Sequence, residues 1–168
     1  MADARSFGPL IHVSAESVGQ PGSRRFRLIA MNEDGQAAFF WLEKEQLIAL
    51  GDAIETVLND EATDIRPRAL DDRDEPPVYP LRGTIEWRIG QLSMGINRPE
   101  RLIVLVATEA SEGEADAVQL GFDYQRGAEL REMIIAVVAS GRPPCPLCGA
   151  PLDSTHICPR KNGHHKQE

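Results

Sequence analysis

The sequence contains one succession of patterns twice, and this repetition limits the folds that the chain can adopt. In each half, three short stretches typical of β-strands precede one stretch with the apolar spacing of a helix. The stretches lie at residues 10–18, 25–31, 36–42 and 44–58, and again at 84–90, 101–107, 117–122 and 124–139. We therefore expect an α+β fold of two β-β-β-α units, in which a mostly antiparallel sheet of about six strands packs against two helices.

Individual stretches carry local signals for these elements. Residues 10–18 alternate between apolar and polar side chains, as in a half-buried strand. Asp34-Gly35 is a hairpin turn signal. Residues 36–42 are apolar on both faces, which predicts a central strand. Asp123 stands where an N-cap of the second helix is expected.

The two halves can be superposed by simple shifts. A shift of 80 residues places Phe40 on Leu120, and a shift of 76 places Leu28 on Val104. The four-residue difference falls in a hairpin loop, where insertions are tolerated. The pattern indicates an internal duplication with a pseudo-twofold axis. The alternative is that any two strand-helix units look alike at this level of detail.

The chain divides into a body, residues 1–141, and a tail, residues 142–168. Within the body, the first unit covers about residues 8–59 and the second about 81–141. Residues 60–80 connect them and contain seven acidic residues and four prolines without periodicity. Such a composition predicts a mobile or extended linker. A dock for a basic partner is the alternative interpretation of this acidic segment.

All three cysteines lie in the last 24 residues, together with His156. Cys145 and Cys148 form a C-x2-C pair, whose turn lets two thiolates reach one ion. With His156 and Cys158 they would complete a tetrahedral Cys3His set, which suits Zn²⁺, with iron as the second choice. A site whose four positions are all filled by protein is structural.

Other assignments of the tail remain open. His164 or His165 could replace His156 as the fourth ligand. Cys145 and Cys148 could instead form a redox pair, or remain as thiols without a metal. A redox pair normally begins a helix that lowers the pKa of one thiol, and the five prolines of the tail argue against such a helix.

The overall charge argues against some functions. The chain has 18 basic and 26 acidic residues and a net charge of −8 at pH 7, whereas general binding to nucleic acid or to an anionic membrane needs a basic surface. The tail has four basic and two acidic residues, but contacts through Arg160 and Lys161 would reach too few phosphates for tight binding. No apolar stretch approaches the roughly 20 residues of a transmembrane helix, and the first residues lack an apolar signal core. We therefore expect a cytoplasmic protein.

The tail reads PPCPLCGAPLD and then HICPRKNGH, and the body opens with FGPL. These motifs resemble those of a bacterial family known only as a domain of unknown function, and the resemblance extends over the whole chain. It implies a Cys/His tail and a functional association with a histidine-phosphatase-like protein and a lipid-kinase-like protein encoded nearby. It implies no reaction and no catalytic residues.

A second candidate site lies at the first predicted hairpin. Arg24 and Arg25, with Arg27 beyond them, come after a loop that could hold a phosphate with its backbone amides and the guanidinium groups. Three arginines of the second unit could join them if the pseudo-twofold axis brings equivalent strands together: Arg88, Arg98 and Arg101. A hairpin loop with solvated arginines is the alternative interpretation.

The sequence lacks the common motifs of nucleotide binding, serine hydrolases and HExxH metalloproteases. We therefore favour a non-enzymatic function, as a cytoplasmic binding or adaptor protein for another protein. Its zinc-binding tail would present a recognition surface or fix the C-terminus to the body. The alternative is an enzyme that acts on a phosphorylated or anionic small molecule in a pocket around Arg24, Arg25 and Arg27, assisted by His12.

Overall fold

The order of elements confirms the two predicted β-β-β-α units. The computed structural model describes residues 3–20, 22–140, 145–148 and 157–160. The first unit comprises β1 (Arg5–Val18), β2 (Arg25–Asn32), β3 (Ala37–Leu42) and α1 (Lys44–Glu61). After the short 3₁₀ turn η1 (Leu70–Asp72), the second unit comprises β4 (Ile85–Asn97), β5 (Leu102–Glu109), β6 (Ala117–Asp123) and α2 (Tyr124–Ala139). In the described ranges, neither helix is long and apolar enough to span a bilayer.

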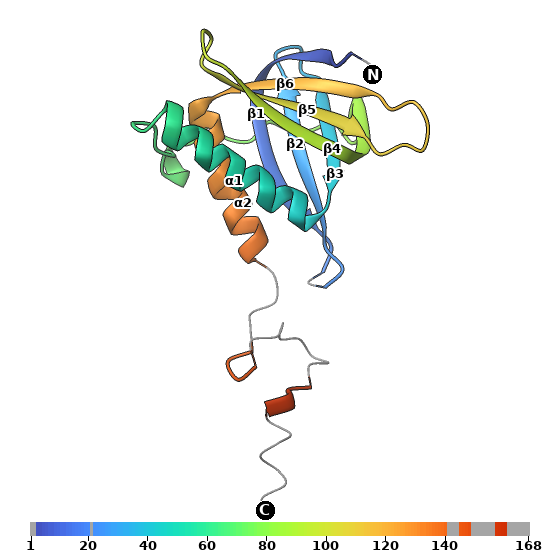
Figure 1. The fold of residues 1–168 in the computed structure, drawn as a ribbon, viewed down its shortest axis with the longest axis vertical. Helices are drawn as coiled ribbons and strands as arrows, with labels where there is room; N and C mark the ends of the chain where they lie inside the picture. Colours follow the sequence, from blue (N-terminus) through green and yellow to red (C-terminus); the bar gives the residue numbers. More distant parts are fainter. Residues whose placement is uncertain (1–2, 21, 141–144, 149–156, 161–168) are drawn as a thin grey trace, which may run out of the picture.

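The six strands form one mixed sheet that closes on itself in the order β1-β2-β3-β4-β5-β6 (Figure 1). Within each unit the three strands are antiparallel neighbours. The units are joined by two parallel pairings, β3 with β4 and β1 with β6. Each parallel pairing links the first strand of one unit to the last strand of the other, as a pseudo-twofold relation requires.

The register of the strands supports the duplication and corrects one of the sequence shifts. Leu28 lies opposite Phe40 in the first unit, and Leu105 lies opposite Leu120 in the second. Leu28 therefore corresponds to Leu105, so its superposition on Val104 was wrong by one residue. The shift that places Phe40 on Leu120 agrees with the register.

Both units carry a β-bulge at the same place. The register between β1 and β2 shifts between Leu10 and His12, and the register between β4 and β5 shifts between Ile89 and Gln91. In the second unit the bulge contains Gly90, where a Cβ atom would lie only 2.9 Å from the Cα of Ala110. A matching bulge is a stronger sign of duplication than matching apolar residues, because it disrupts the ladder at one specific position.

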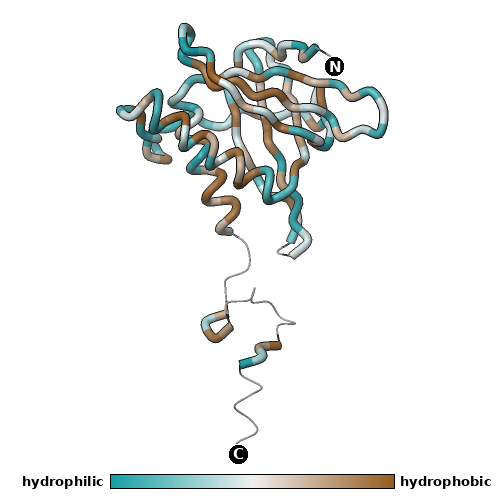
Figure 2. The backbone as a smooth tube through the Cα atoms, viewed as in Figure 1, coloured by the Kyte–Doolittle hydropathy of each residue, from teal (hydrophilic) through white to brown (hydrophobic). Residues whose placement is uncertain are grey.

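The two helices lie beside each other against the sheet, and their apolar faces complete its core (Figures 1 and 2). A Cβ atom at Gly51 of α1 would lie 3.2 Å from Ile134 of α2, which shows how closely the helices approach. Asp123 caps α2 as predicted, because its Oδ1 accepts a hydrogen bond of 2.7 Å from the backbone N–H of Arg126. Helix and strand side chains share one buried cluster that includes Leu28, Phe40, Leu47, Ile54, Leu105, Leu120, Leu130 and Ile134.

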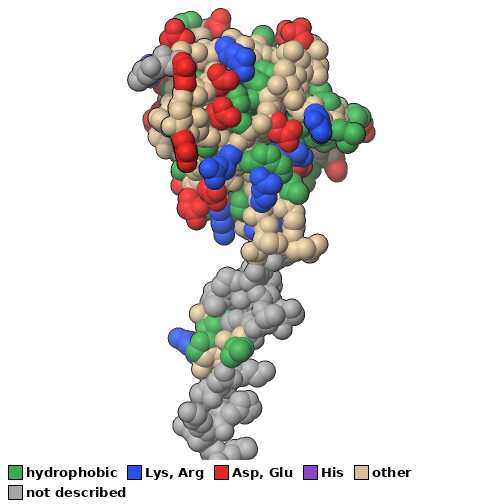
Figure 3. Space-filling model, turned by 90° about the vertical axis from the view of Figure 1, so that its right-hand side faces the viewer, with side chains coloured by type: hydrophobic (Ala, Val, Ile, Leu, Met, Phe, Trp, Pro, Cys, Tyr) green, Lys and Arg blue, Asp and Glu red, His purple; other side chains and the backbone are tan. Residues whose placement is uncertain are grey.

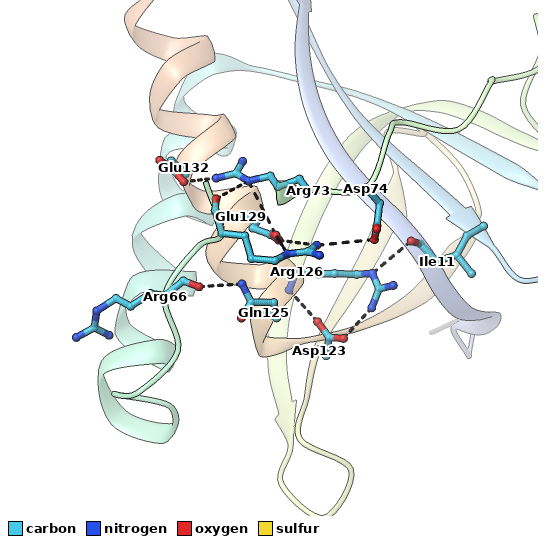
Figure 4. Close-up of polar contacts among 10 residues, drawn as sticks. Ile11, Arg66, Arg73, Asp74, Asp123, Gln125, Arg126, Glu129 and Glu132 are labelled. Carbon is cyan, nitrogen blue, oxygen red and sulfur yellow. Dashed lines mark hydrogen bonds and ion pairs between the residues drawn. The ribbon is translucent and has the colours of Figure 1, made fainter. Parts of the chain in front are cut away.

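The linker between α1 and β4 is extended, and ion pairs hold it against α2 (Figure 4). Glu129 of α2 is only 4% exposed and accepts a 2.7 Å hydrogen bond from the Nε of Arg68. The guanidinium of Arg73 lies 3.9 Å from the same carboxylate and pairs with Glu132 one turn further along the helix. A buried carboxylate needs such partners, so Arg68 and Arg73 tie this segment to the helix.

Further along, the linker covers the outer face of the first unit. Tyr79 packs edge-on against Phe39, with 6.3 Å between the ring centroids. Phe39, Ile29 and Ala37 form a small buried cluster outside the main core, and Tyr79 packs against it. The linker therefore forms part of the wall of the body.

Candidate functional site

The three cysteine side chains come together in the described parts of the tail. Their Sγ atoms all lie within 4.8 Å of one another. A turn at residues 146–148 connects Cys145 to Cys148, and Cys158 belongs to the second described segment, residues 157–160. The turn in the C-x2-C pair is the one predicted from its spacing, and it directs both sulfurs to one point.

The spacing of the sulfurs fits a shared metal ion. The Sγ atoms of Cys145 and Cys158 are 3.8 Å apart, far longer than the roughly 2.05 Å of a disulfide bond. Two sulfurs that each lie about 2.3 Å from one tetrahedral ion are separated by about 3.8 Å. Cys145 and Cys158 are buried and Cys148 is half-buried. Three close cysteines could therefore bind a metal.

The rest of the predicted ligand set lies outside the described residues. This holds for His156 and for its two possible replacements, His164 and His165. The fourth ligand therefore stays a prediction from the sequence.

The arginines of the first hairpin are divided between different contacts. Arg24 reaches the end of α2, where its guanidinium donates to the carbonyl oxygen of Val137 at 3.1 Å and to the Oγ of Ser140 at 3.0 Å. Arg27 forms an ion pair with Glu16 of β1. Each guanidinium therefore uses two of its five N–H donors within the protein.

Arg25 faces a hollow of about 530 Å³, here called the arginine hollow. Its guanidinium lies 4.0 Å from the centre of the Trp41 ring. Arg24 and Arg88 also line this hollow, whereas Arg27 does not. Figure 3 shows basic side chains beside a hydrophobic patch at the lower end of the body, where β2 begins and α2 ends. Lys44 and two carboxylates complete the charged lining: Glu43 and Glu45.

The other two arginines of the second unit lie elsewhere. Arg98 is hydrogen-bonded to Glu61 at the end of α1, and this hydrogen bond raises the pKa of Arg98. Arg101 lies over the ring of Tyr124. Of the three arginines that the pseudo-twofold axis was expected to bring in, Arg88 alone lines the arginine hollow.

His12 lines a different hollow, bounded by β1, the linker and α2, and here called the linker hollow. Its Nε2 lies 2.7 Å from the hydroxyl of Tyr79 and 3.1 Å from the hydroxyl of Ser14. Burial, and secondly the positive charge of Arg126, lower the pKa of His12 below its ordinary value of 6.5. The imidazole is therefore neutral near pH 7.

Sequence reasoning missed the partners of His12. Ser14 shares the polar face of its strand, so the period of two could have pointed to it. Tyr79 stands in the segment that its composition predicts to be a mobile or extended linker, and an aromatic residue among prolines and acids was the one available signal. Glu129 lay on a predicted helix with nothing in its local sequence to indicate burial.

Comparison with known proteins agrees with the resemblance found in the sequence. A family model described as "Protein of unknown function (DUF3090)" matches residues 5–158. The match covers the body and extends to Cys158 of the tail. No curated protein matches the chain.

The state of His12 can be tested by its titration. We expect an NMR pKa below 6.5, because burial and Arg126 both disfavour the charged ring. Since the folded pKa lies below the unfolded one, the stability that His12 contributes is present above pH 6.5 and is lost as the pH falls through the folded pKa. An Arg126→Gln variant should raise this pKa but leave it below 6.5, because burial is the larger cause.

The resonance of His12 is identified by its loss in a His12→Gln variant. Arg88→Gln, a charge removal at the arginine hollow, serves as the matched control and should leave the titration unchanged. A wild-type pKa of 6.5 or higher would contradict the predicted environment.

Proposed function

The chain belongs to the DUF3090 family of proteins of unknown function, and from its cysteine cluster we propose that it is a cytoplasmic adaptor with a structural zinc site. The observation that carries this proposal is the meeting of three Sγ atoms within 4.8 Å from two separate segments. Three thiolates favour Zn²⁺ over harder ions such as Mg²⁺. His156 would supply the fourth ligand and close the site.

The surface beside the cysteines supports a protein partner. Leu147 lies between the two cysteines of the first segment, and Ile157 directly precedes Cys158. Their side chains are 46% and 74% exposed, and Figure 3 shows hydrophobic side chains on the described part of the tail. Apolar side chains held outward by a metal-stabilised turn offer a recognition surface. Of the two roles considered for the tail, this exposure favours recognition over attachment to the body.

The metal is tested by elemental analysis of the purified chain. We expect about one zinc per chain, as in other closed thiolate sites. A Cys148→Ser variant should lose it, because the hydroxyl that replaces the thiolate is a poor zinc ligand. Leu147→Ala, a change at the neighbouring position that removes no ligand, should keep the full zinc content. Absence of metal, or iron in its place, would contradict the assignment of zinc.

The adaptor role is tested by placing a photo-crosslinking amino acid at Ile157 in cells. We expect one recurring protein adduct, which disappears when Cys148→Ser is introduced as well, because loss of the metal would disorganise the surface. The same amino acid at Val78, which is 94% exposed on the linker, is the control and should not give this adduct. Adducts that are the same from both positions would reject the role. An adduct between Ile157 and the body of the same chain would mean that the tail fixes the C-terminus instead.

One observation favours a second function, the binding of an anionic small molecule. The arginine hollow gathers four cationic side chains against two carboxylates, and Arg25 and Arg88 are among those that line it. We expect inorganic pyrophosphate to change the fluorescence of Trp41, because an anion that draws Arg25 away from the indole ring alters its surroundings. The measurement uses a Trp87→Phe background. Arg25→Gln should abolish the response and Arg98→Gln should keep it. No response to pyrophosphate or phosphate rejects this function.

A further inference from the structure

The linker hollow brings together three hydrogen-bonding side chains that no local sequence motif predicts. His12 and Ser14 come from β1, and Tyr79 comes from the linker. The Nε2 of His12 is within hydrogen-bond distance of both hydroxyl groups, whereas the two hydroxyl oxygens are 3.4 Å apart. The three groups form a compact cluster at the wall of a hollow of about 620 Å³.

The cluster has more hydrogen-bonding capacity than its members use among themselves. A neutral Nε2 without a proton accepts one good hydrogen bond, which comes either from the hydroxyl of Tyr79 or from that of Ser14. The remaining hydroxyl proton then has only the long contact with the other hydroxyl. With a proton on Nε2, both hydroxyl protons need other acceptors. In either tautomer a hydroxyl donor is left for a molecule in the hollow.

The remainder of the lining is mainly apolar or already neutralised. Apolar surface comes from Ile11, Leu70, Pro76, Pro77 and Met133. The three arginines that line the hollow have partners: Arg68 and Arg73 bind Glu129, and Arg126 binds Asp123 and the carbonyl oxygen of Ile11. These partners offset the positive charge of the arginines, and Glu75 adds a further carboxylate to the lining, so the hollow offers an anion little net attraction.

From this arrangement we propose that the linker hollow binds a small uncharged molecule with an apolar body and a hydroxyl group, which hydrogen-bonds to the His12–Ser14–Tyr79 cluster. The size and the mainly apolar lining are those of ordinary small-molecule sites. The hydroxyl of the ligand would accept from the spare hydroxyl donor of the cluster and donate to a free lone pair.

The walls of the site are held in place before the ligand arrives. Tyr79 is fixed by its packing against Phe39. The linker is tied to α2 through Glu129, which is buried. Binding therefore orders few protein groups, so little of the binding free energy is lost as conformational entropy of the protein. The neutral state of His12 near pH 7 agrees with an uncharged ligand.

The proposal is tested by NMR titration of the full chain with phenol, which has an apolar ring and one hydroxyl. Toluene, which lacks the hydroxyl, and benzoate, which is charged, are titrated in parallel. We expect phenol to shift the ring signals of His12 and to saturate in the millimolar range. Toluene should bind at least about fivefold more weakly, because it lacks one neutral hydrogen bond. Benzoate should also bind more weakly, because its charge is desolvated beside arginines that are already paired with carboxylates.

Matched variants locate the binding. Tyr79→Phe keeps the ring that packs on Phe39 and removes only the hydroxyl, so it should weaken phenol binding about fivefold. Tyr124→Phe, the same change at the other tyrosine, should leave binding unchanged. Equal binding of phenol and toluene, tighter binding of benzoate, no shift of His12, or an undiminished affinity in Tyr79→Phe would each overturn the proposal. Because these measurements leave the cysteines untouched, their outcome is independent of the zinc assignment.

Discussion

The parallel pairing of β1 with β6 closes the sheet, and it determines the positions of both hollows. Since β6 runs directly into α2, the pairing places the beginning of α2 beside β1. Arg126 in the first turn of α2 can therefore reach the carbonyl oxygen of Ile11. At its other end the helix reaches the β1–β2 hairpin, where Arg24 donates to the carbonyl oxygen of Val137. One helix thus forms a wall of the linker hollow and, near its last turn, of the arginine hollow.

A single buried carboxylate explains why a segment with the composition of a mobile linker becomes a wall. Glu129 is removed from water, and such a group is strongly destabilising unless cations approach it. Arg68 and Arg73, both from the linker, supply the positive charge. Their contacts fix the linker before η1 and just after it, and the chain then continues to Tyr79. Most of the acidic residues nearby stay exposed, whereas Pro76 and Pro77 line the linker hollow.

The sequence predicted the elements and the cysteine cluster because both depend on local spacing. Strand and helix periods are visible in short windows, and a C-x2-C pair brings two sulfurs together through one turn. The register was harder to predict. Residues 102–107 are apolar without alternation, so Leu28 could be matched to Val104 or Leu105, and only the ladder of hydrogen bonds distinguishes them. The contact between His12 and Tyr79 joins residues 67 positions apart, and no local pattern encodes such a contact.

The two units have kept their framework and differ in the segment that leaves each helix. Ser14 lies opposite Ile29 as Ser93 lies opposite Val106, so the position of His12 corresponds to that of Gln91. Gln91 and Ser93 are exposed, whereas His12 and Ser14 are half-buried under the linker. The strands alone therefore do not make the linker hollow. The segment after α1 makes it by adding Tyr79, and the segment after α2 carries the cysteines. Tyr79 and the cysteines thus lie on the segments that follow the two helices, outside the core that the two units share, where residues can vary without disturbing that core.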